Sequence, residues 1–377
     1  MLKIRDLEAA MERIAPSALA EDWDNVGLLA GERERPLRRI MLCIDLREQV
    51  LKEAIGNKAD AIVAYHPPIF RPVKRFDDRT SEGRVILGAL AAGIAIHSPH
   101  TAADAAEGGV NDWLTEAFGS GERRPLTPCS EPGSKNQFKV VTFCPTTATD
   151  AIRKAMAATG AGEIGDYTSC SFQFPGNGTF LGGEGSSPTI GERGRLERVE
   201  EQCLGMICSA KNLSAAVAAL RAAHPYEEPP VEIHPLEPTP SANRGAGHIL
   251  ELEKPLAFNA LAEKLREHLG TRRMTGHDPV SRRRHQRIGF CAGSGGELLP
   301  TAIAEGCTLF VTGELKHHDV LAAEAAGCAV LLPGHTNTER GWLKVLRRRL
   351  PAELKNFGRS KVAVTTSRKD VDLLDSM

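Results

Sequence analysis

The sequence AIVAYHPP, residues 61–68, holds a short apolar run that ends at a tyrosine and a histidine. A short unbroken apolar run closed by prolines is typical of a strand that is buried on both faces of a parallel sheet. His66 is therefore expected at the point where a buried strand ends. Because ligands of parallel α/β sheets gather at the carboxyl ends of the strands, this stretch predicts both the fold class and the place of a site.

Two further apolar runs also end beside side chains that bind metals. The runs are residues 93–96 and 329–332, and the side chains are His100 with Asp104 and His335 with Glu339. If a helix begins at each histidine, the carboxylate four positions later lies on the same helix face. Imidazole nitrogen and carboxylate oxygen suit zinc, iron or manganese. One interpretation is a metal site assembled from distant strand ends; the other is that each histidine caps a strand or packs in the core.

The composition limits the remaining function classes. At 377 residues the chain exceeds one hydrophobic core, so two or three domains are expected. A formal net charge of -1 and an aromatic content of 5% argue against nucleic acid as a partner. No apolar stretch reaches the roughly 20 residues of a membrane span, and the N-terminus lacks the apolar segment of a signal peptide. The nine scattered cysteines form no CxxC pair, which predicts reduced thiols and a cytoplasmic protein.

The two ends of the chain have similar layouts. Helical and strand patterns alternate through the first part, and a second α/β block runs from about residue 246 to a final strand at 361–365. This alternation predicts largely parallel sheets with helices on their faces. The middle is different, because linker-like stretches at 126–137 and 235–242 enclose two strand–helix–strand patterns and a Gly-rich loop at 176–194. That order predicts a ferredoxin-like α+β insert.

The motifs together resemble the Nif-three-like family, the dinuclear-metal family often labelled GTP cyclohydrolase 1 type 2 homologues. They are EDWDNVGL at 21–28, YHPPIF at 65–70, His100 with Asp104, TGE at 312–314 with His318, and GHTNTER at 334–340. The segments 160–165, 170–172, 178–180 and 223–228 resemble the PII/CutA-like domain of long bacterial members. The resemblance implies two similar α/β halves, residues 1–131 and 241–377, which form one unit interrupted by the insert at 132–240.

The resemblance also implies a ligand set. Carried over position by position, the metal ligands fall on Tyr65, His66, Asp104, His335 and Glu339. Tyr65 stands where bacterial members carry a second histidine, and a neutral phenol with an ordinary pKa near 10 is a poor ligand. His100 either binds metal directly or orients Asp104. The expected cofactors are one or two divalent ions per subunit; no separate catalytic residue and no organic cofactor site stand out.

Two loops are each open to two interpretations. The glycine-rich loop at 291–296 either offers backbone amides to an anion or is a tight turn. Residues 22–25 either form a loop around the metal cavity or anchor the core. The basic runs at 282–284 and 347–349 are expected on a solvated face or a subunit contact.

The implied assembly is a toroidal homohexamer with metal ions facing an internal cavity. The favoured function is metal-dependent hydrolysis of a nucleotide or a related small molecule, with GTP cyclohydrolase 1 type 2 activity as a narrower hypothesis. The alternative is a non-catalytic protein for metal storage, metal delivery or regulation.

Overall fold

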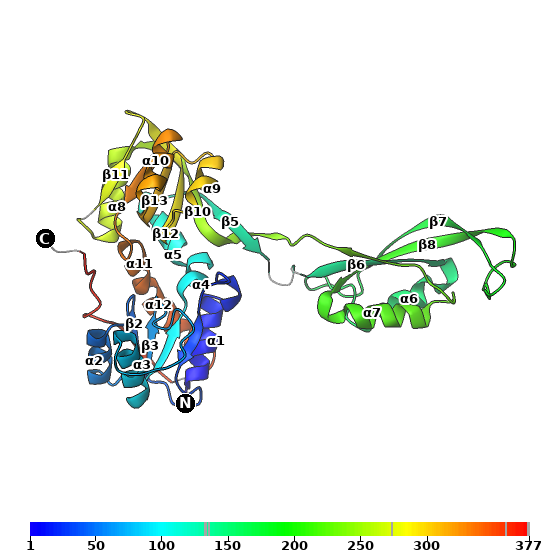
Figure 1. Cartoon of the computed structure of the whole chain (residues 1–377), viewed down its shortest axis with the longest axis horizontal. Helices are drawn as coiled ribbons and strands as arrows, with labels where there is room; N and C mark the ends of the chain where they lie inside the picture. Colours follow the sequence, from blue (N-terminus) through cyan, green and yellow to red (C-terminus); the bar gives the residue numbers. More distant parts are fainter. Residues whose placement is uncertain (132–133, 135, 273, 359, 375–377) are drawn as a thin grey trace. The chain divides into compact units, whose positions relative to one another are not determined.

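The computed structural model describes residues 1–131, 134, 136–272, 274–358 and 360–374. The chain folds as two compact units (Figure 1). The main unit contains Met1–Cys129 and Ser241–Met377, and the insert unit contains Ser130–Pro240. Residue 132, at the boundary expected between the first half and the insert, lies outside the described residues, as do 133 and 135 of the expected linker.

The first sheet of the main unit has the strand order β1-β4-β3-β2-β15. Neighbours among β2, β3, β4 and β15 are parallel, and β1 is antiparallel to β4. The strands are β1 (Gly27–Ala30), β2 (Arg39–Cys43), β3 (Ala61–Ala64), β4 (Ala95–Ser98) and β15 (Ala363–Thr366). All four residues of β3 are buried, which confirms the strand expected from its apolar run.

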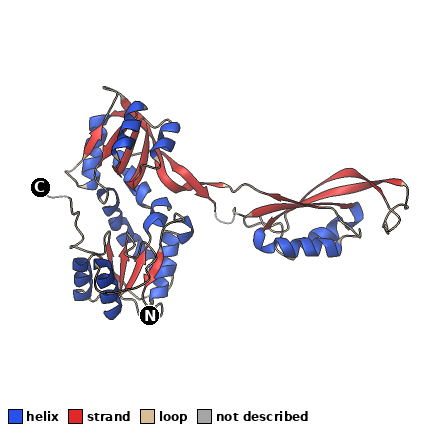
Figure 2. Cartoon of the chain, in the orientation of Figure 1, coloured by secondary structure: helices blue, strands red, loops and turns tan. Residues whose placement is uncertain are grey.

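Helices cover both faces of this sheet (Figure 2). Apolar side chains of α2 (Glu48–Gly56) and α3 (Ser81–Ala91) pack on one face, and those of α1 (Ile4–Ile14) and α12 (Trp342–Leu354) pack on the other. The short helices α4 (His100–Ala105) and α5 (Val110–Thr115) follow β4. Because both faces are covered, the inner strands can be apolar throughout.

The final strand was expected in the second block, and this expectation is wrong. β15 pairs in parallel with β2 of the first sheet, with Val364 opposite Ile40. The reason lies in α12, whose Leu346 and Leu350 belong to the same buried cluster as Leu7 of α1. This packing carries the chain back to the first half before β15 begins.

The second sheet has the order β11-β14-β13-β12-β10-β5. Strands β12, β13 and β14 are parallel, whereas β10 is antiparallel to β12 and β11 to β14. The strands are β5 (Gly121–Ser130), β10 (Pro240–Ala257), β11 (Thr275–His277), β12 (Arg284–Ser294), β13 (Leu309–Glu314) and β14 (Ala329–Leu332). The helices are α8 (Phe258–Leu269), α9 (Leu299–Ala304), α10 (His317–Ala325) and α11 (Asn337–Arg340).

Part of the expected linker is a strand. Residues 126–130 belong to β5, at the edge of the second sheet beside β10. Pro125 and Pro128 lie within β5, and proline is tolerated on an edge strand because its missing N–H is not needed there. The proline-rich composition of this stretch therefore marks a sheet edge.

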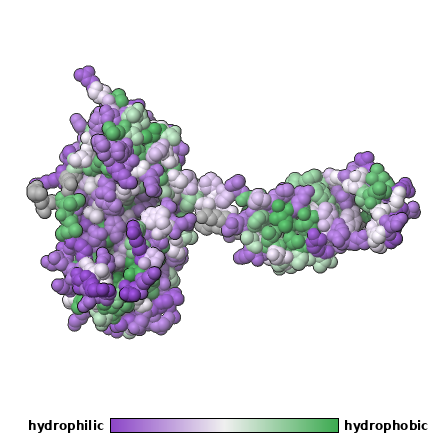
Figure 3. Space-filling model, in the orientation of Figure 1, coloured by the Kyte–Doolittle hydropathy of each residue, from purple (hydrophilic) through white to green (hydrophobic). Residues whose placement is uncertain are grey.

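The insert unit is a ferredoxin-like β-α-β-β-α-β fold with strand order β7-β8-β6-β9. Its elements are β6 (Gln137–Pro145), α6 (Thr149–Ala157), β7 (Phe172–Leu181), β8 (Leu196–Ser209), α7 (Ala210–Ala223) and β9 (Val231–Pro235). The loop expected at 176–194 is partly wrong, because residues 176–181 continue β7 along β8. Apolar side chains remain visible on the surface over α6 and α7 (Figure 3).

The cysteines and the helices add two further observations. Six of the cysteines are buried thiols: Cys43, Cys144, Cys203, Cys208, Cys307 and Cys328. Within the described ranges, no helix combines the length and the apolar character that crossing a bilayer requires.

Replacing Gly341 by alanine is expected to destabilise the main unit. A Cβ at this position would lie 2.0 Å from Cζ2 of Trp113, and that buried indole also packs against His268, with ring centroids 4.7 Å apart. Overpacking of this kind costs about 1–3 kcal/mol. Gly56→Ala is the matched control, since its Cβ meets nothing within 4 Å at the end of α2. Urea unfolding should show a loss of stability for Gly341→Ala only. Equal stability of the two variants would contradict this packing.

Candidate metal centre

The carboxyl ends of parallel strands from both sheets meet at one cavity of about 590 Å³ in the main unit. His66 follows β3, His100 follows β4, and His335 follows β14. The hydroxyl of Ser98 donates a hydrogen bond to the carbonyl oxygen of Tyr65 at 2.8 Å, which ties the ends of β4 and β3 together. The strand-end histidines therefore line the same space, as the sequence predicts.

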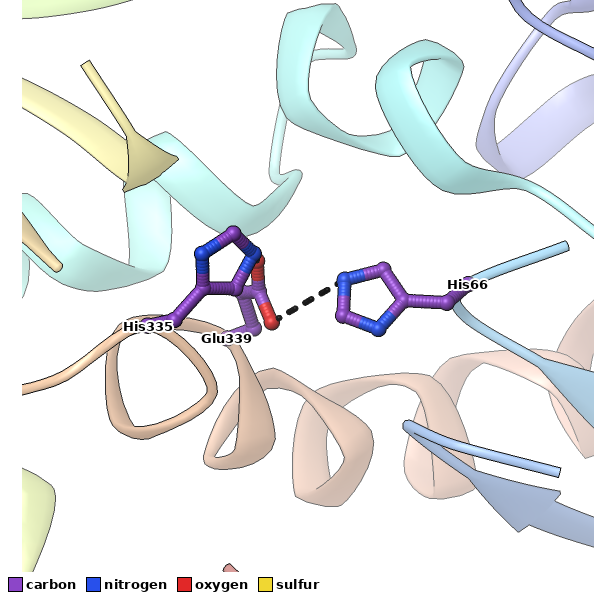
Figure 4. Close-up of side chains that lie close together, drawn as sticks. All are labelled: His66, His335 and Glu339. Carbon is purple, nitrogen blue, oxygen red and sulfur yellow. Dashed lines mark ion pairs between the residues drawn. The ribbon is translucent and has the colours of Figure 1, made fainter. Parts of the chain in front are cut away.

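Three of these side chains form a compact cluster (Figure 4). Each of His66, His335 and Glu339 offers one ligand atom, and these atoms lie within 4.8 Å of one another. Nε2 of His335 is 3.2 Å from Oε1 of Glu339, and Nε2 of His66 is 3.4 Å from Oε2 of the same carboxylate. One carboxylate thus faces imidazoles from both halves of the main unit.

The two histidines are oriented by further carboxylates. Nδ1 of His66 lies 2.9 Å from Oδ1 of Asp45, and Nδ1 of His335 lies 3.0 Å from Oε1 of Glu314. A carboxylate on one ring nitrogen fixes the ring orientation and makes the other nitrogen a better metal ligand. Each imidazole therefore turns Nε2 toward Glu339.

The loop before α11 explains why His335 and Glu339 meet. The N–H of Thr338 donates to the carbonyl oxygen of His335 at 3.1 Å, so the chain turns helically from the histidine. The carboxylate four residues later then lies on the histidine's side of the turn, which confirms the spacing argument. Gly293 approaches this pair so closely that a Cβ would lie 2.7 Å from Oε1 of Glu339. A side chain at residue 293 would fill the ligand space.

The charges of the cluster stabilise one another. Burial opposes protonation of His66, but the carboxylates of Asp45 and Glu339 outweigh it and raise the pKa of His66 to about 10. Burial also opposes protonation of His335, yet Glu339 and Glu314 raise its pKa to about 9. Burial disfavours the Glu339 carboxylate, and the two histidines nevertheless lower its pKa to about 2. Without a metal ion the site is an anion held between two imidazolium rings.

The residues of the cluster fit a divalent ion. Oε2 of Glu339 is fully buried and makes no hydrogen bond, although it lies 3.4 Å from His66. In the metal-free protein only the nearby imidazolium of His66 balances this oxygen, and a divalent ion that displaces the imidazole proton could bind it directly. Two imidazole nitrogens and a carboxylate are also the donor set of zinc, iron and manganese sites with open positions.

Asp104 and Tyr65 lie in the cavity wall but outside the three-residue cluster. The phenol hydroxyl donates a hydrogen bond to Oδ1 of Asp104. Burial raises the pKa of Asp104 to about 7. Burial and the nearby Asp104 also raise the pKa of Tyr65 well above its ordinary value. In this arrangement Tyr65 is a neutral hydrogen-bond donor to the carboxylate.

His100 contacts the carboxylate of Asp24, a partner outside the two roles that the sequence left open, metal binding and the orientation of Asp104. Its Nδ1 lies 2.8 Å from Oδ1 of Asp24, whose Oδ2 accepts the N–H of Thr101 at 3.1 Å. These contacts hold His100 at a φ of 24°, which is unusual for a residue other than glycine. His100 is therefore tied to the loop at 22–25, which lines the cavity through Trp23.

Sequence reasoning missed the orienting role of Asp45. This residue follows β2, so it lies at the carboxyl end of a strand next to β3. A carboxylate two residues beyond an apolar strand was the signal that could have identified it. Glu314, the other orienting carboxylate, ends β13 beside β14 and belongs to a motif already noted in the sequence.

Comparisons with known proteins show which family the chain belongs to. The Duf34/NIF3 (NGG1p interacting factor 3) family matches residues 2–371. A GTP cyclohydrolase 1 type 2 homolog of Halalkalibacterium halodurans is 33% identical over 92% of this chain and 91% of its own length. NIF3-like protein 1 of Bos taurus is 32% identical over 99% of this chain and 92% of its own length. The crystal structure of a Bacillus cereus protein related to NIF3 is 30% identical, with a TM-score of 0.67, and the match covers 100% of this chain and 99% of that one.

The matches extend across both halves of the main unit and the insert between them. The resemblance inferred from the motifs is therefore confirmed over nearly the entire length. This chain belongs to the Duf34/NIF3 family.

Proposed function

We propose that this protein binds a divalent metal ion through His66, His335 and Glu339 and uses it to hydrolyse a small molecule. The observation that carries the proposal is the buried carboxylate between two carboxylate-oriented imidazoles, at the wall of a cavity of about 590 Å³. Cavities of this size hold ligands as large as nucleosides. The name GTP cyclohydrolase 1 type 2 homolog of similar proteins supports hydrolysis as the reaction class.

Different residues of the chain have different roles around the ion. A divalent ion supplies a Lewis acid that polarises the scissile group and lowers the pKa of water. Asp45 and Glu314 keep the two imidazoles turned toward Glu339. Asp104 lines the same cavity, and we propose it as the ligand that a second ion would use. Tyr65 orients that carboxylate through its hydroxyl.

Chelation tests the proposal. The protein, loaded in turn with zinc, iron or manganese, is assayed on a panel of nucleotides and nucleosides that includes GTP. Hydrolysis that is lost with a chelator and restored with metal supports the enzyme. Absence of turnover on the whole panel would favour the alternative of metal storage or delivery, and transfer of the ion to a metal-free acceptor protein would then support that alternative.

We also propose a homohexamer, which the resemblance of the motifs to the family supports. Large exposed apolar side chains in the insert, such as Phe172 at 68% and Phe174 at 52% exposed, favour contact with another copy. Light scattering should give a mass near six times the 40.6 kDa of the chain. A mass of one chain at all concentrations would contradict the hexamer.

Metal binding near neutral pH is expected to release almost two protons per ion. His66 and His335, with pKa values of about 10 and about 9, both carry a proton at pH 7 in the metal-free protein. A protonated imidazole cannot coordinate, so each ligand must lose its proton, and affinity should rise by up to about a hundredfold per pH unit below pH 9. Calorimetry in buffers of different ionisation enthalpy measures the protons. Release of none would show that these imidazoles are neutral or do not bind.

A further inference from the structure

The metal cavity carries an exposed aromatic pair that the metal site does not use. Trp23 is 58% exposed and Phe70 is 46% exposed, and both line the cavity. Their ring centroids are 5.8 Å apart at an interplanar angle of 60°. His100 completes the group, with its centroid 6.1 Å from that of Trp23 and 6.3 Å from that of Phe70. Large aromatic surface is thus left open beside the cluster.

The pair is held in place by buried polar contacts. The Asp24 side chain is fully buried and accepts hydrogen bonds from the N–H groups of Asn25 at 2.7 Å and Thr101 at 3.1 Å. The amide of Asn25 donates to the carbonyl oxygen of Ile69, which joins the loop of Trp23 to the loop of Phe70. The aromatic faces are therefore positioned before any ligand arrives, which reduces the entropy lost on binding.

The charges of the cavity exclude one class of ligand. The described lining residues include five carboxyl groups and neither lysine nor arginine; the carboxyl groups belong to Glu21, Asp45, Asp104, Glu297 and Glu339. Sites for nucleotide phosphates instead supply arginine, lysine or free backbone N–H groups. The imidazolium rings of His66 and His335 are already paired with the carboxylates of Asp45, Glu339 and Glu314. A polyphosphate in this cavity would therefore face an excess of negative charge at close range.

Two amides of the glycine-rich loop that line the cavity are not free to bind a phosphate. The N–H of Ala292 donates to Oδ1 of Asn111 at 2.9 Å, and the N–H of Gly293 donates to the hydroxyl of Thr338 at 2.8 Å. These two amides are already used inside the protein. Glu297, the residue directly after this loop, adds a carboxylate to the cavity wall.

We infer that the cavity takes a planar heterocycle, uncharged or positively charged and without a polyphosphate, which stacks on Trp23 and Phe70 with its reactive edge toward the metal cluster. This inference rests on the proposed hydrolase and names its substrate class. Stacking on aromatic side chains is available to any planar ring. A nucleoside fits these requirements better than a nucleoside triphosphate.

Tryptophan fluorescence of the metal-free, full-length protein tests the inference without turnover. Trp113 and Trp342 are 7% and 0% exposed, so a ligand in the cavity should quench Trp23. The probes are guanosine, guanosine methylated on its imidazole ring, which is cationic, and GTP. Both nucleosides should quench, the cation at least as strongly as the neutral one, and GTP should bind about tenfold or more weakly than guanosine.

Variants assign the binding to the aromatic pair. Trp23→Leu should weaken guanosine binding, read by calorimetry, about five- to hundredfold, and Trp23→Phe should restore most of it. Phe70→Ala should weaken binding, whereas Phe76→Ala should not, since Phe76 is equally exposed at 46% but does not line the cavity. Thermal melting confirms that each variant folds.

Several results would overturn the inference. They are equal binding of GTP and guanosine, no quenching by either nucleoside, full binding by Trp23→Leu, or a Trp23 that iodide cannot reach because another copy covers it. If only the hydrolase proposal fails, the result is different: the metal-loaded protein would bind the nucleoside but would not hydrolyse it.

Discussion

Replacing Glu339 by glutamine is expected to weaken divalent metal binding by more than about a hundredfold. The variant keeps the side chain's size but loses the negative charge that faces both imidazoles, with Nε2 of His335 at 3.2 Å and Nε2 of His66 at 3.4 Å. Changes to residues that only orient a ligand already cost about 10–100-fold in affinity, and Glu339 itself supplies a ligand oxygen. Competition with a chromogenic chelator, together with elemental analysis of the purified protein, measures the loss.

Two further variants make this result specific. Glu297→Gln removes a carboxylate that lines the same cavity outside the cluster, and it should bind metal nearly as the unaltered protein does. The metal affinity of Asp45→Asn should lie between those of Glu339→Gln and Glu297→Gln, because Asp45 contacts Nδ1 of His66 and not the ligand nitrogen. If Glu297→Gln lost as much affinity as Glu339→Gln, the ion would lie elsewhere in the cavity.

Replacing Asp370 by alanine is expected to destabilise the main unit by about 3 kcal/mol. The Asp370 side chain is fully buried; its Oδ2 lies 2.8 Å from Nη1 of Arg340 and accepts the N–H of Ile44 at 2.6 Å. Alanine leaves the guanidinium, whose side chain is only 25% exposed, without its carboxylate. Breaking a buried ion pair on one side costs about 3–5 kcal/mol, and the partial exposure of Arg340 places the expected loss at the lower end.

The matched control is a surface ion pair. Arg33 and Glu8 are 2.7 Å apart with side chains 67% and 26% exposed, so Glu8→Ala should cost about 1 kcal/mol or less. Urea unfolding followed through Trp342, which is fully buried in the main unit, compares the variants. Equal midpoints for Asp370→Ala and the unaltered protein would mean that the segment after β15 contributes nothing to stability.

Local patterns in the sequence predict the central part of the site. The apolar runs at 61–64 and 329–332 form β3 and β14, and His66 and His335 follow them. The spacing of His335 and Glu339 predicts their contact, because one helical turn depends only on neighbouring residues. These features need no knowledge of how distant segments pack.

Contacts between distant segments could not be predicted in this way. Asp45 is 21 residues from His66, and Asp24 is 76 residues from His100. No periodicity links such pairs, since the fold alone brings them together. The Asp104 carboxylate likewise meets Tyr65, which is 39 residues away, through side chains that the strand pattern leaves unspecified.

Tertiary packing also overrides local composition at the sheet edges. The composition of residues 126–137 predicts a linker, but residues 126–130 lie in the edge strand β5. β15 was expected beside the second block, and it completes the first sheet because α12 packs against α1. At β5 the local pattern therefore predicts the wrong kind of element, whereas at β15 it predicts the strand but not its partner.

The return of β15 to the first sheet has a consequence for biosynthesis. Ile44 and Asp370, which join across this edge, are separated by 326 residues. During synthesis on the ribosome, β15 cannot join the first sheet until both the insert and the second sheet have been synthesised. The insert, whose strands pair only within Gln137–Pro235, can fold earlier as a unit. The ligands His335 and Glu339 come from the second half, so the nascent chain can become competent to bind metal only after both the insert and most of the second sheet have been synthesised.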